Sequence, residues 1–335
     1  MTVYPFAKFV AKKVVFYGIV TFLALNFIFF IPRLMPGDPI SRFMPRGGGG
    51  PSGEKYDDMI KMYKGLFGLD KPLFGQYINF WSQLFAGNLG QSISKWPMSV
   101  AEAVLPRLPY TFALVIPVLL ISFFVGNWIG AKAAYMGGKR SELVYFFSVF
   151  SNRVPDFWLG MIFVFLLARS AKLFPPVGYA SPGVLPSWEL SYFLDLFSHY
   201  LLPFFTLLIV FLGGWATGMR SMVIHEMDSG YVRYSEQLGF RKSKLMSYAQ
   251  RNAILPQFTG LNLYLSALIG ETAIIETIFA WPGIGRTLFD AVWGNDYPLI
   301  IGAFLVTLVI VIIGNFLIDI LYGFIDPRIR TGRGR

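Results

Sequence analysis

The sequence has 335 residues, of which 55% are hydrophobic, 18% aromatic and only 14% charged. A soluble protein carries about 25% charged residues, so most of this chain is expected to lie in a lipid bilayer. The sequence contains no cysteine, which excludes disulfides, thiolate metal sites and cysteine nucleophiles, and its two histidines offer little material for a metal centre. We therefore predict a membrane protein without a metal or cofactor of its own.

Six apolar stretches predict an all-α fold with about six transmembrane helices. A bilayer core about 30 Å thick needs about 20 apolar residues in a helix, and the stretches cover residues 14–31, 111–130, 143–167, 200–222, 261–279 and 298–325. The first exceeds the roughly 7–15 residues of a signal-peptide core and no small-residue cleavage site follows it, so we expect it to be retained as a span. Pro155 interrupts the third stretch and predicts a kink there.

Lysine and arginine near the span ends predict the orientation, because cytoplasmic loops carry an excess of both. More than half of the 29 basic residues fall in four short segments, at 8–13, 132–140, 220–251 and 328–335. The residues 1–13 and the basic tail 326–335 are therefore expected in the cytoplasm, with the chain in the cytoplasmic (inner) cell membrane. The net charge of +10 is then a topology signal, and nucleic acid is not an expected partner.

The stretch from residue 32 to residue 110 is expected outside the cytoplasm, as a long loop with short helices. A glycine-rich linker at 47–53 precedes two candidate helices, at 57–66 and 74–85. The aromatic residues Tyr77, Phe80 and Trp81 of the second suit a membrane interface.

Enzyme motifs are incomplete. Residues 48–55 imitate a phosphate-binding loop, but Glu54 stands where that loop needs a lysine. His225 and Glu226 begin like a zinc-protease helix, yet Ser229 stands where the second histidine belongs. We therefore expect a chain that is not itself an enzyme.

A polar, basic connection at 223–256 lies within the expected five-helix core at 111–325. Gly239 can end a helix in the left-handed conformation, which predicts a helix–turn–helix along the membrane face. Two interpretations stay open from composition: a solvated loop that satisfies the charge bias, and a docking surface.

Ionisable residues within the expected spans are the second pointer to function, because a charge at membrane depth is costly and faces the interior of a helix bundle. They are Arg153, Asp156, Glu271, Glu276 and Asp319. Both direct contact with substrate and interior pairing between helices fit them. Arg153 and Asp156 are three residues apart and could pair on one helix face, although Pro155 lies between them.

Residues 276–286 lead out of the fifth span, and Trp281 and Pro282 mark the break in the helix. A short amphipathic helix is expected at 287–293. Irregular backbone at a membrane edge is tolerated beside protein or a watery cavity, so both a gate and an interfacial cap fit this segment.

Taken together, these segments resemble the inner-membrane permease subunits of peptide-type ABC importers, specifically the B-type subunit of the dipeptide/oligopeptide group. The resemblance covers nearly the whole chain, and order and spacing make it specific. The matching segments are Arg33–Pro39, Gly68–Leu73, Gly87–Ser92, Arg107–Thr111, Arg251–Pro256, Glu276–Gly285, Asp296–Pro298, Asp319–Tyr322 and Asp326–Arg330. Departures from the pattern are the residues Tyr234–Gln237 before Gly239, Asn88, and the glycine run 47–50.

The resemblance implies a type I ABC importer permease fold and alternating access driven by ATP and Mg²⁺ in separate ATPase subunits. It implies as partners a homologous second permease subunit (a heterodimer), two ABC ATPase subunits, an extracytoplasmic solute-binding protein and the lipid bilayer. The ATPase-coupling surface would then include Tyr231, Val232, Arg233, Ser235, Glu236, Gly239, Phe240 and Lys244. Pathway or gate candidates would be Arg153, Asp156, Glu271, Glu276, Trp281, Pro282 and Asp319.

Alternatives remain at this point. The same machinery could import oligosaccharides or nickel complexes instead of peptides. An ion-coupled carrier would use Glu271, Glu276 and Asp319 as ion sites, but the internal repeats common in such carriers are not evident.

Overall fold

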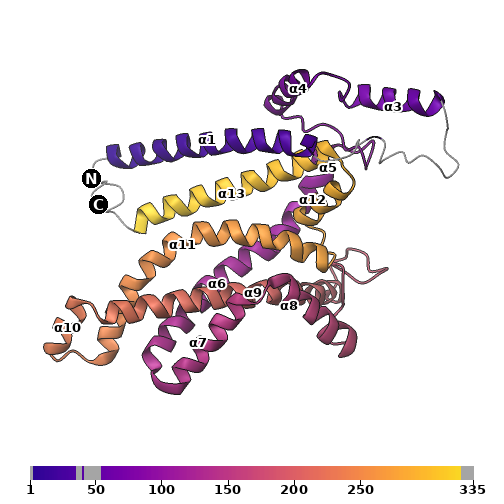
Figure 1. Ribbon diagram of the computed structural model, residues 1–335. Coiled ribbons are helices and arrows are strands. Elements are labelled where there is room, and N and C mark those ends of the chain that lie inside the picture. The colour runs from indigo at the N-terminus through magenta and orange to yellow at the C-terminus, as the bar shows by residue number, and fades with distance from the viewer. Residues whose placement is uncertain (1–2, 35–39, 41–53, 326–335) are drawn as a thin grey trace. The chain divides into compact units, whose positions relative to one another are not determined.

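The computed structural model describes residues 3–34, 40 and 54–325 (Figure 1). Residues 35–39 of the matching segment Arg33–Pro39, the glycine-rich linker at 47–53 and the basic tail at 326–335 lie outside these residues. The described chain is built from helices, which are α1 Val3–Leu34, α3 Glu54–Leu66, α4 Leu73–Phe85, α5 Val100–Val104, the 3₁₀ turn η1 Leu105–Arg107, α6 Leu108–Met136, α7 Gly138–Arg153, α8 Asp156–Phe163, the π-helical η2 Val164–Ser170, α9 Leu190–Met227, α10 Gly230–Gln237, α11 Lys242–Ile278, α12 Ile284–Trp293 and α13 Tyr297–Ile325.

The chain divides into two compact units. The first unit contains Met1–Val10, Phe112–Trp281 and Ile313–Arg335, and the second contains Ala11–Thr111 and Pro282–Ile312. The predicted helices at 57–66, 74–85 and 287–293 are confirmed as α3, α4 and α12, each within a few residues.

Within the described residues, five helices are long and apolar enough to cross a membrane, and a bent pair makes a sixth span if it counts as one. The pair is α7 with α8 and η2, and its axis bends by 97°. The kink predicted at Pro155 is confirmed. Proline cannot donate the helical hydrogen bond, and it holds the preceding Val154 in an extended conformation at ψ 126°.

Two helices are longer than their apolar stretches. α9 has 38 residues, and α11 begins at Lys242 and includes the polar segment 251–256. Hydropathy marks only the part of a helix that suits lipid, whereas backbone hydrogen bonding continues into polar sequence as long as no residue breaks it. The connection predicted at 223–256 is therefore mostly the ends of two long helices.

In the first unit, glycines bring α6 against α9. A Cβ added at Gly126 would lie 2.6 Å from the Cβ of Trp215, and one at Gly130 would lie 2.9 Å from the Cβ of Met219 and overlap the Ala216 carbonyl oxygen. Helices in a membrane gain no hydrophobic energy by associating, so small residues four apart let their backbones approach and gain dispersion contacts. The pair Gly126 and Gly130 is such a motif.

The opposite side of α9 packs on α7 and α11. A Cβ at Gly213 would lie 2.5 Å from the Ser148 carbonyl oxygen of α7, and Gly214 leaves room for the Tyr264 ring of α11. That ring stacks on Trp215 with centroids 3.9 Å apart. Each of the three contacts with α9 therefore contains a glycine: Gly126 and Gly130 of α6 face α9, and Gly213 and Gly214 of α9 face α7 and α11.

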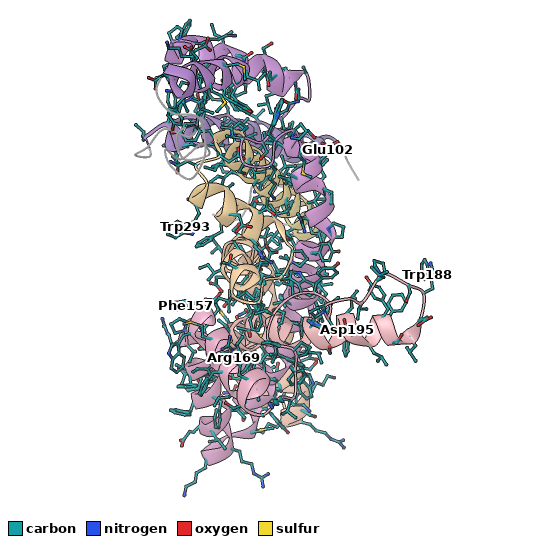
Figure 2. All side chains as sticks on the ribbon, turned by 90° about the vertical axis from the view of Figure 1, so that its right-hand side faces the viewer. Glu102, Phe157, Arg169, Trp188, Asp195 and Trp293 are labelled. Carbon is teal, nitrogen blue, oxygen red and sulfur yellow. The ribbon has the colours of Figure 1, made fainter. Side chains whose placement is uncertain are left out.

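A connection from η2 to α9 completes the first unit. Asp195 in the second turn of α9 accepts hydrogen bonds from the backbone N–H and the hydroxyl of Ser181, at 2.8 and 2.6 Å. Figure 2 shows Asp195 on the beginning of α9 with Trp188, which is 96% exposed, at the tip of this segment and Phe157 and Arg169 on another side.

In the second unit, α4 packs on α1 through aromatic rings. Phe29 lies 5.2 Å from Tyr77 and 5.3 Å from Phe80 between ring centroids, and Phe22 stacks on Trp81 at 5.6 Å. The aromatic residues that the sequence suggested for a membrane interface thus contact the first transmembrane helix.

The close approach of α6 and α9 can be tested with Gly130→Leu. We expect this substitution to lower the free energy of unfolding by about 3 kcal/mol, since overpacking at a fixed backbone forces the two helices apart. Thermal unfolding of the purified chain in detergent measures the effect.

The matched control is Gly270→Leu in α11, where an added Cβ meets no atom within 4 Å. Equal losses of stability for the two variants would contradict the packing role of Gly130.

Candidate functional site

The predicted helix–turn–helix is confirmed as α10, which joins the ends of α9 and α11 at one end of the first unit (Figure 1). Gly239 has φ +81°, the left-handed conformation that glycine adopts without strain. Its N–H donates to the Glu236 carbonyl at 2.9 Å, and the Phe240 N–H donates to the Ser235 carbonyl at 3.2 Å. These two bonds form a Schellman turn, which explains why the chain reverses here.

One residue anchors α10 to the unit. Val232 is 1% exposed, and α10 packs against the beginning of α11. A buried cluster of α6, α9 and α11 holds the same end together, formed by Ala131, Met219, Val223, Met246, Ala249 and Ala253. The short helix α10 is therefore held in place by packing against the long helices.

The other side of α10 and its turn is exposed. It presents Tyr231, Tyr234, Leu238 and Phe240 among basic residues, with the Lys244 ammonium 5.0 Å from the Phe240 ring centroid. Of the predicted coupling residues, Tyr231, Arg233, Glu236, Gly239, Phe240 and Lys244 are exposed, Ser235 is half-buried and Val232 is the buried anchor.

Tyr231 is fixed toward α9 by a hydrogen bond of 2.6 Å from its hydroxyl to the Glu226 carboxylate. Partial burial and this bond raise the pKa of the Tyr231 hydroxyl, which stays a protonated donor at neutral pH. Arg233 makes only an exposed ion pair with Asp228 at 3.6 Å, which contributes little to stability. The surface therefore combines aromatic rings with cations that remain available to a partner.

The structure does not bring Arg153 and Asp156 together as an ion pair within the described residues. α7 ends at Arg153 and α8 begins at Asp156, and the 97° bend between them leaves Arg153 exposed and Asp156 only 7% exposed. The three-residue spacing would place both on one face of an unbroken helix, but Pro155 prevents that helix.

Asp156 and Glu271 form a second polar location. One carboxylate oxygen of each is buried without a hydrogen-bond partner among the described residues, and the two groups are close enough to influence one another electrostatically. Glu271 lines a cavity of about 250 Å³ together with Asn152 and Tyr264. Of the pathway candidates, these two carboxylates therefore lie near one another, on α8 and α11.

Asp319 lies elsewhere and joins two helices. Its carboxylate accepts a hydrogen bond of 2.8 Å from the Asn262 amide of α11, and it is 7% exposed. Asn262 and Glu271 are nine residues apart, about 14 Å along a helix axis. The Asn262–Asp319 bond is consistent with the interior-pairing interpretation of Asp319, and contact with substrate stays a prediction.

Glu276 and Trp281 build the end of α11. The Trp281 N–H donates to the Glu276 carbonyl at 2.8 Å, and Ala280 between them has φ +50°. Glu276 is fully buried and Trp281 is 4% exposed, with its ring 6.0 Å from that of Tyr200. The helix therefore ends at Ile278, before the left-handed Ala280 and before the proline that the sequence suggested as the breaking point.

Pro282 begins the segment that belongs to the second unit. α12 follows it, and the Ile284 N–H at its first turn donates to the Thr111 hydroxyl at 2.9 Å. Pro282 is buried, as is Gly283. In the second unit this segment is a packed cap on the beginning of α6.

Asp296 is a residue whose role the sequence reasoning missed. It is fully buried, and its carboxylate accepts hydrogen bonds from the Ser92 hydroxyl at 2.5 Å and from the Ser94 N–H and hydroxyl at 2.8 and 2.7 Å. It also accepts from the Leu299 N–H at 3.1 Å, as the N-cap of α13. The signal was present: an aspartate directly before an apolar helix is a typical N-cap.

Comparison with known proteins decides the family. Residues 123–331 match the family described as binding-protein-dependent transport system inner membrane component, which is more than half of the chain. The chain belongs to this family. It is therefore a multi-pass membrane component of a transport system that works with a binding protein, and the resemblance inferred from the sequence is confirmed.

Curated relatives cover nearly the whole chain. The di/tripeptide transport system permease protein DppB of Pseudomonas aeruginosa (strain UCBPP-PA14) is 32% identical over 93% of this chain and 96% of its own length. The oligopeptide transport system permease protein AppB of Bacillus subtilis (strain 168) is 30% identical over 90% and 92%, and the dipeptide transport system permease protein DppB of Escherichia coli (strain K12) is 30% identical over 92% and 95%. The prediction of a transport subunit rather than an enzyme is confirmed by these relatives.

The role of Asp296 is tested by Asp296→Ala. Removing the carboxylate leaves the Ser92 and Ser94 groups without their acceptor, so we expect the second unit to lose about 3 kcal/mol of stability, since hydrogen bonds to charged groups contribute roughly 1.5–3 kcal/mol each and are not additive. Limited proteolysis between residues 86 and 99, followed by mass spectrometry, reports the released loop.

Asp290→Ala is the control, because Asp290 is exposed on the neighbouring α12. It should change stability by less than about 0.5 kcal/mol. The assignment is wrong if the two variants are cleaved at the same rate.

Proposed function

We propose that the chain is one permease subunit of an ATP-driven importer that carries dipeptides and oligopeptides delivered by a solute-binding protein. The observation that carries this proposal is that relatives 30–32% identical over at least 90% of the chain are all named for transport of peptides. A homologous second permease would complete the pathway, two ABC ATPase subunits would bind ATP and Mg²⁺, and this chain would hold no cofactor.

The exposed side of α10 is the surface that would contact an ATPase subunit. It offers Tyr231, Tyr234 and Phe240 as rings for a groove and Arg233 and Lys244 as cations, while Val232 and the ends of α9 and α11 hold it in place. ATP binds the closed arrangement of the ATPases more tightly than the open one, and only such a difference in affinity can drive a conformational change. A helix fixed to two long spans would pass that movement into the membrane.

The same arrangement supports a proposal for the orientation in the membrane. α10, the turn between α6 and α7, and those ends of α1 and α13 that belong to the first unit lie toward one end of that unit (Figure 1). The basic segments of the sequence occur at these places, so we assign this end to the cytoplasm. Both termini would then be cytoplasmic, and residues 32–110 would be extracytoplasmic.

The pathway would be lined from the side of α8 and α11 that carries Asp156 and Glu271. Their unpartnered oxygens suit a transient polar ligand such as the ammonium group of a peptide. Glu276 and Trp281 would act as a gate at the outer end of α11, Pro282 would remain in the packed cap of the second unit, and Arg153 and Asp319 would lie beside the pathway.

Coupling is tested with Gly239→Arg. A side chain at φ +81° strains the turn by about 1–2 kcal/mol and places a new cation on the proposed ATPase contact. We expect ATP-dependent dipeptide uptake by the assembled transporter to be abolished, while the variant still inserts into the membrane in normal amounts. Uptake is measured in vesicles with a labelled dipeptide, and with a labelled oligosaccharide in parallel.

Gly138→Arg is the matched control, because Gly138 also has a positive φ, +59°, and an added Cβ there meets no atom within 4 Å. This variant should retain uptake. Normal uptake by Gly239→Arg would refute the coupling assignment, preferential uptake of the oligosaccharide would refute the peptide substrate, and uptake driven by an ion gradient without ATP would refute the importer itself.

A further inference from the structure

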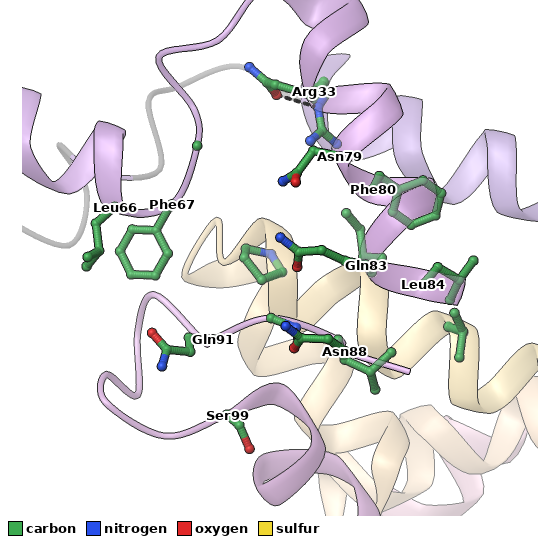
Figure 3. A pocket seen from close by; sticks show the side chains of 17 residues that line it. Arg33, Leu66, Phe67, Asn79, Phe80, Gln83, Leu84, Asn88, Gln91 and Ser99 are labelled. Atoms are coloured by element: carbon green, nitrogen blue, oxygen red, sulfur yellow. Dashed lines mark hydrogen bonds between the residues drawn. The ribbon is translucent and has the colours of Figure 1, made fainter. Parts of the chain in front are cut away.

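The second unit contains a cavity of about 380 Å³ that the transport function does not explain. Its wall is formed by Arg33 at the end of α1, by residues 66–68 at the end of α3, by α4, by the loop 88–91 with Ser99, and by the first three turns of α13 (Figure 3). Pockets that hold small molecules have volumes of roughly 300–1,000 Å³. The space is therefore large enough for a polar head group.

The polar wall is made of one cation and uncharged amides. The polar side chains are those of Arg33, Gln76, Asn79, Gln83, Asn88, Gln91 and Ser99. Among the described lining residues none is acidic. The nearby Glu102 carboxylate accepts hydrogen bonds from the hydroxyl and the N–H of Ser99, at 2.8 and 2.9 Å. The electrostatic character of the cavity thus suits an anion.

Arg33 is held in place without an ion pair among the described residues. Its Nε donates to the Gln76 side-chain oxygen at 3.0 Å, its Nη1 donates to the Phe29 carbonyl at 2.7 Å, and its guanidinium lies 3.7 Å from the centroid of the Phe29 ring. A guanidinium carries more N–H donors than these two bonds use. Within the described part of the chain the remaining donors have no partner, and a planar fork suits the oxygens of a phosphate.

Two amides of α4 are also available. The side chains of Asn79 and Gln83 line the cavity and have no hydrogen-bond partner within the described part of the chain. Figure 3 shows the Asn79 amide close to the Arg33 guanidinium. Cation and neutral donors therefore converge on one space.

The position of the cavity favours a lipid over a soluble anion. Arg33 is the last residue but one of an apolar span, and Pro298, Ile301 and Leu305 contribute an apolar wall from the beginning of another. The ends of spans lie at the level of lipid head groups. On α1, exposed apolar residues continue from Arg33 in the direction of the bilayer, namely Phe27, Phe30 and Ile31.

We propose that this cavity binds the phosphate group of a membrane phospholipid, with Arg33 contacting the phosphate and Asn79 and Gln83 contacting the head group, while the acyl chains follow the apolar faces of α1 and α13. The bound lipid would tie α1 to α4 and α13 within the second unit. Free phosphate shares the anionic chemistry, but only the lipid uses the apolar wall.

The experiment uses the purified full chain, freed of lipid in detergent and titrated with phosphatidylglycerol under native mass spectrometry. Arg33→Gln should weaken binding about tenfold or more, as expected for loss of a charge-assisted hydrogen bond. Asn79→Leu should weaken it several-fold and leaves the bonds of Arg33 to Gln76 and Phe29 in place. Lys71→Gln, which removes an exposed charge near the cavity, should bind as the unmodified chain does.

Unchanged lipid affinity of Asn79→Leu would overturn the proposal. This holds even if Arg33→Gln binds the lipid poorly, because that variant can lose binding through a loss of thermal stability alone. Inorganic phosphate and a dipeptide are added in separate arms. Displacement of the lipid by millimolar phosphate, or by the dipeptide, would assign the cavity to a soluble ligand and overturn the lipid assignment. Retention of the lipid in both arms, with loss in both cavity variants, supports it.

Discussion

The close approach of helices to α9 is the constraint on which the first unit depends. In a bilayer the lipid tails are as apolar as the side chains, so helices associate by fitting together rather than by escaping water. Gly126 and Gly130 remove side chains where α6 meets α9, and Gly213 and Gly214 do the same toward α7 and α11. Because Gly214 has no side chain, the Tyr264 ring fits beside it and stacks on Trp215 with centroids 3.9 Å apart.

This packing explains how the proposed coupling helix α10 could transmit a movement to the membrane-spanning helices. α10 is short and has one fully buried side chain, so it would move freely if α9 and α11 did not fix both of its ends. α11 then continues as one helix of 37 residues from Lys242 to Ile278, carrying Glu271 and Glu276 in its second half. In the proposed mechanism, a displacement at the turn of Gly239 would therefore act directly on the helix that holds Glu271 and Glu276.

Polar contacts at both ends of α13 have a different role from the carboxylates of α8 and α11. The Asp296 carboxylate at its beginning accepts hydrogen bonds from Ser92 and Ser94 and from its own first turn. The Asp319 carboxylate near its end accepts a hydrogen bond from the Asn262 amide. A buried carboxylate without such partners is costly, and a partnered one specifies which segments meet. The free oxygens of Asp156 and Glu271 stand out by comparison, since nothing in the described chain compensates them.

The sequence by itself determined the features that depend on neighbouring residues: the apolar stretches, the kink at Pro155, the glycine turn at Gly239 and the family membership carried by ordered motifs. Those are local properties of hydropathy and backbone conformation. Only the tertiary structure decided that Arg153 and Asp156 do not pair and that Tyr77 and Phe80 pack on Phe29. The same holds for the hydrogen bond from the Ser92 hydroxyl to the Asp296 carboxylate. These contacts join residues from different helices, and their distances follow from how the helices pack, which no local pattern encodes.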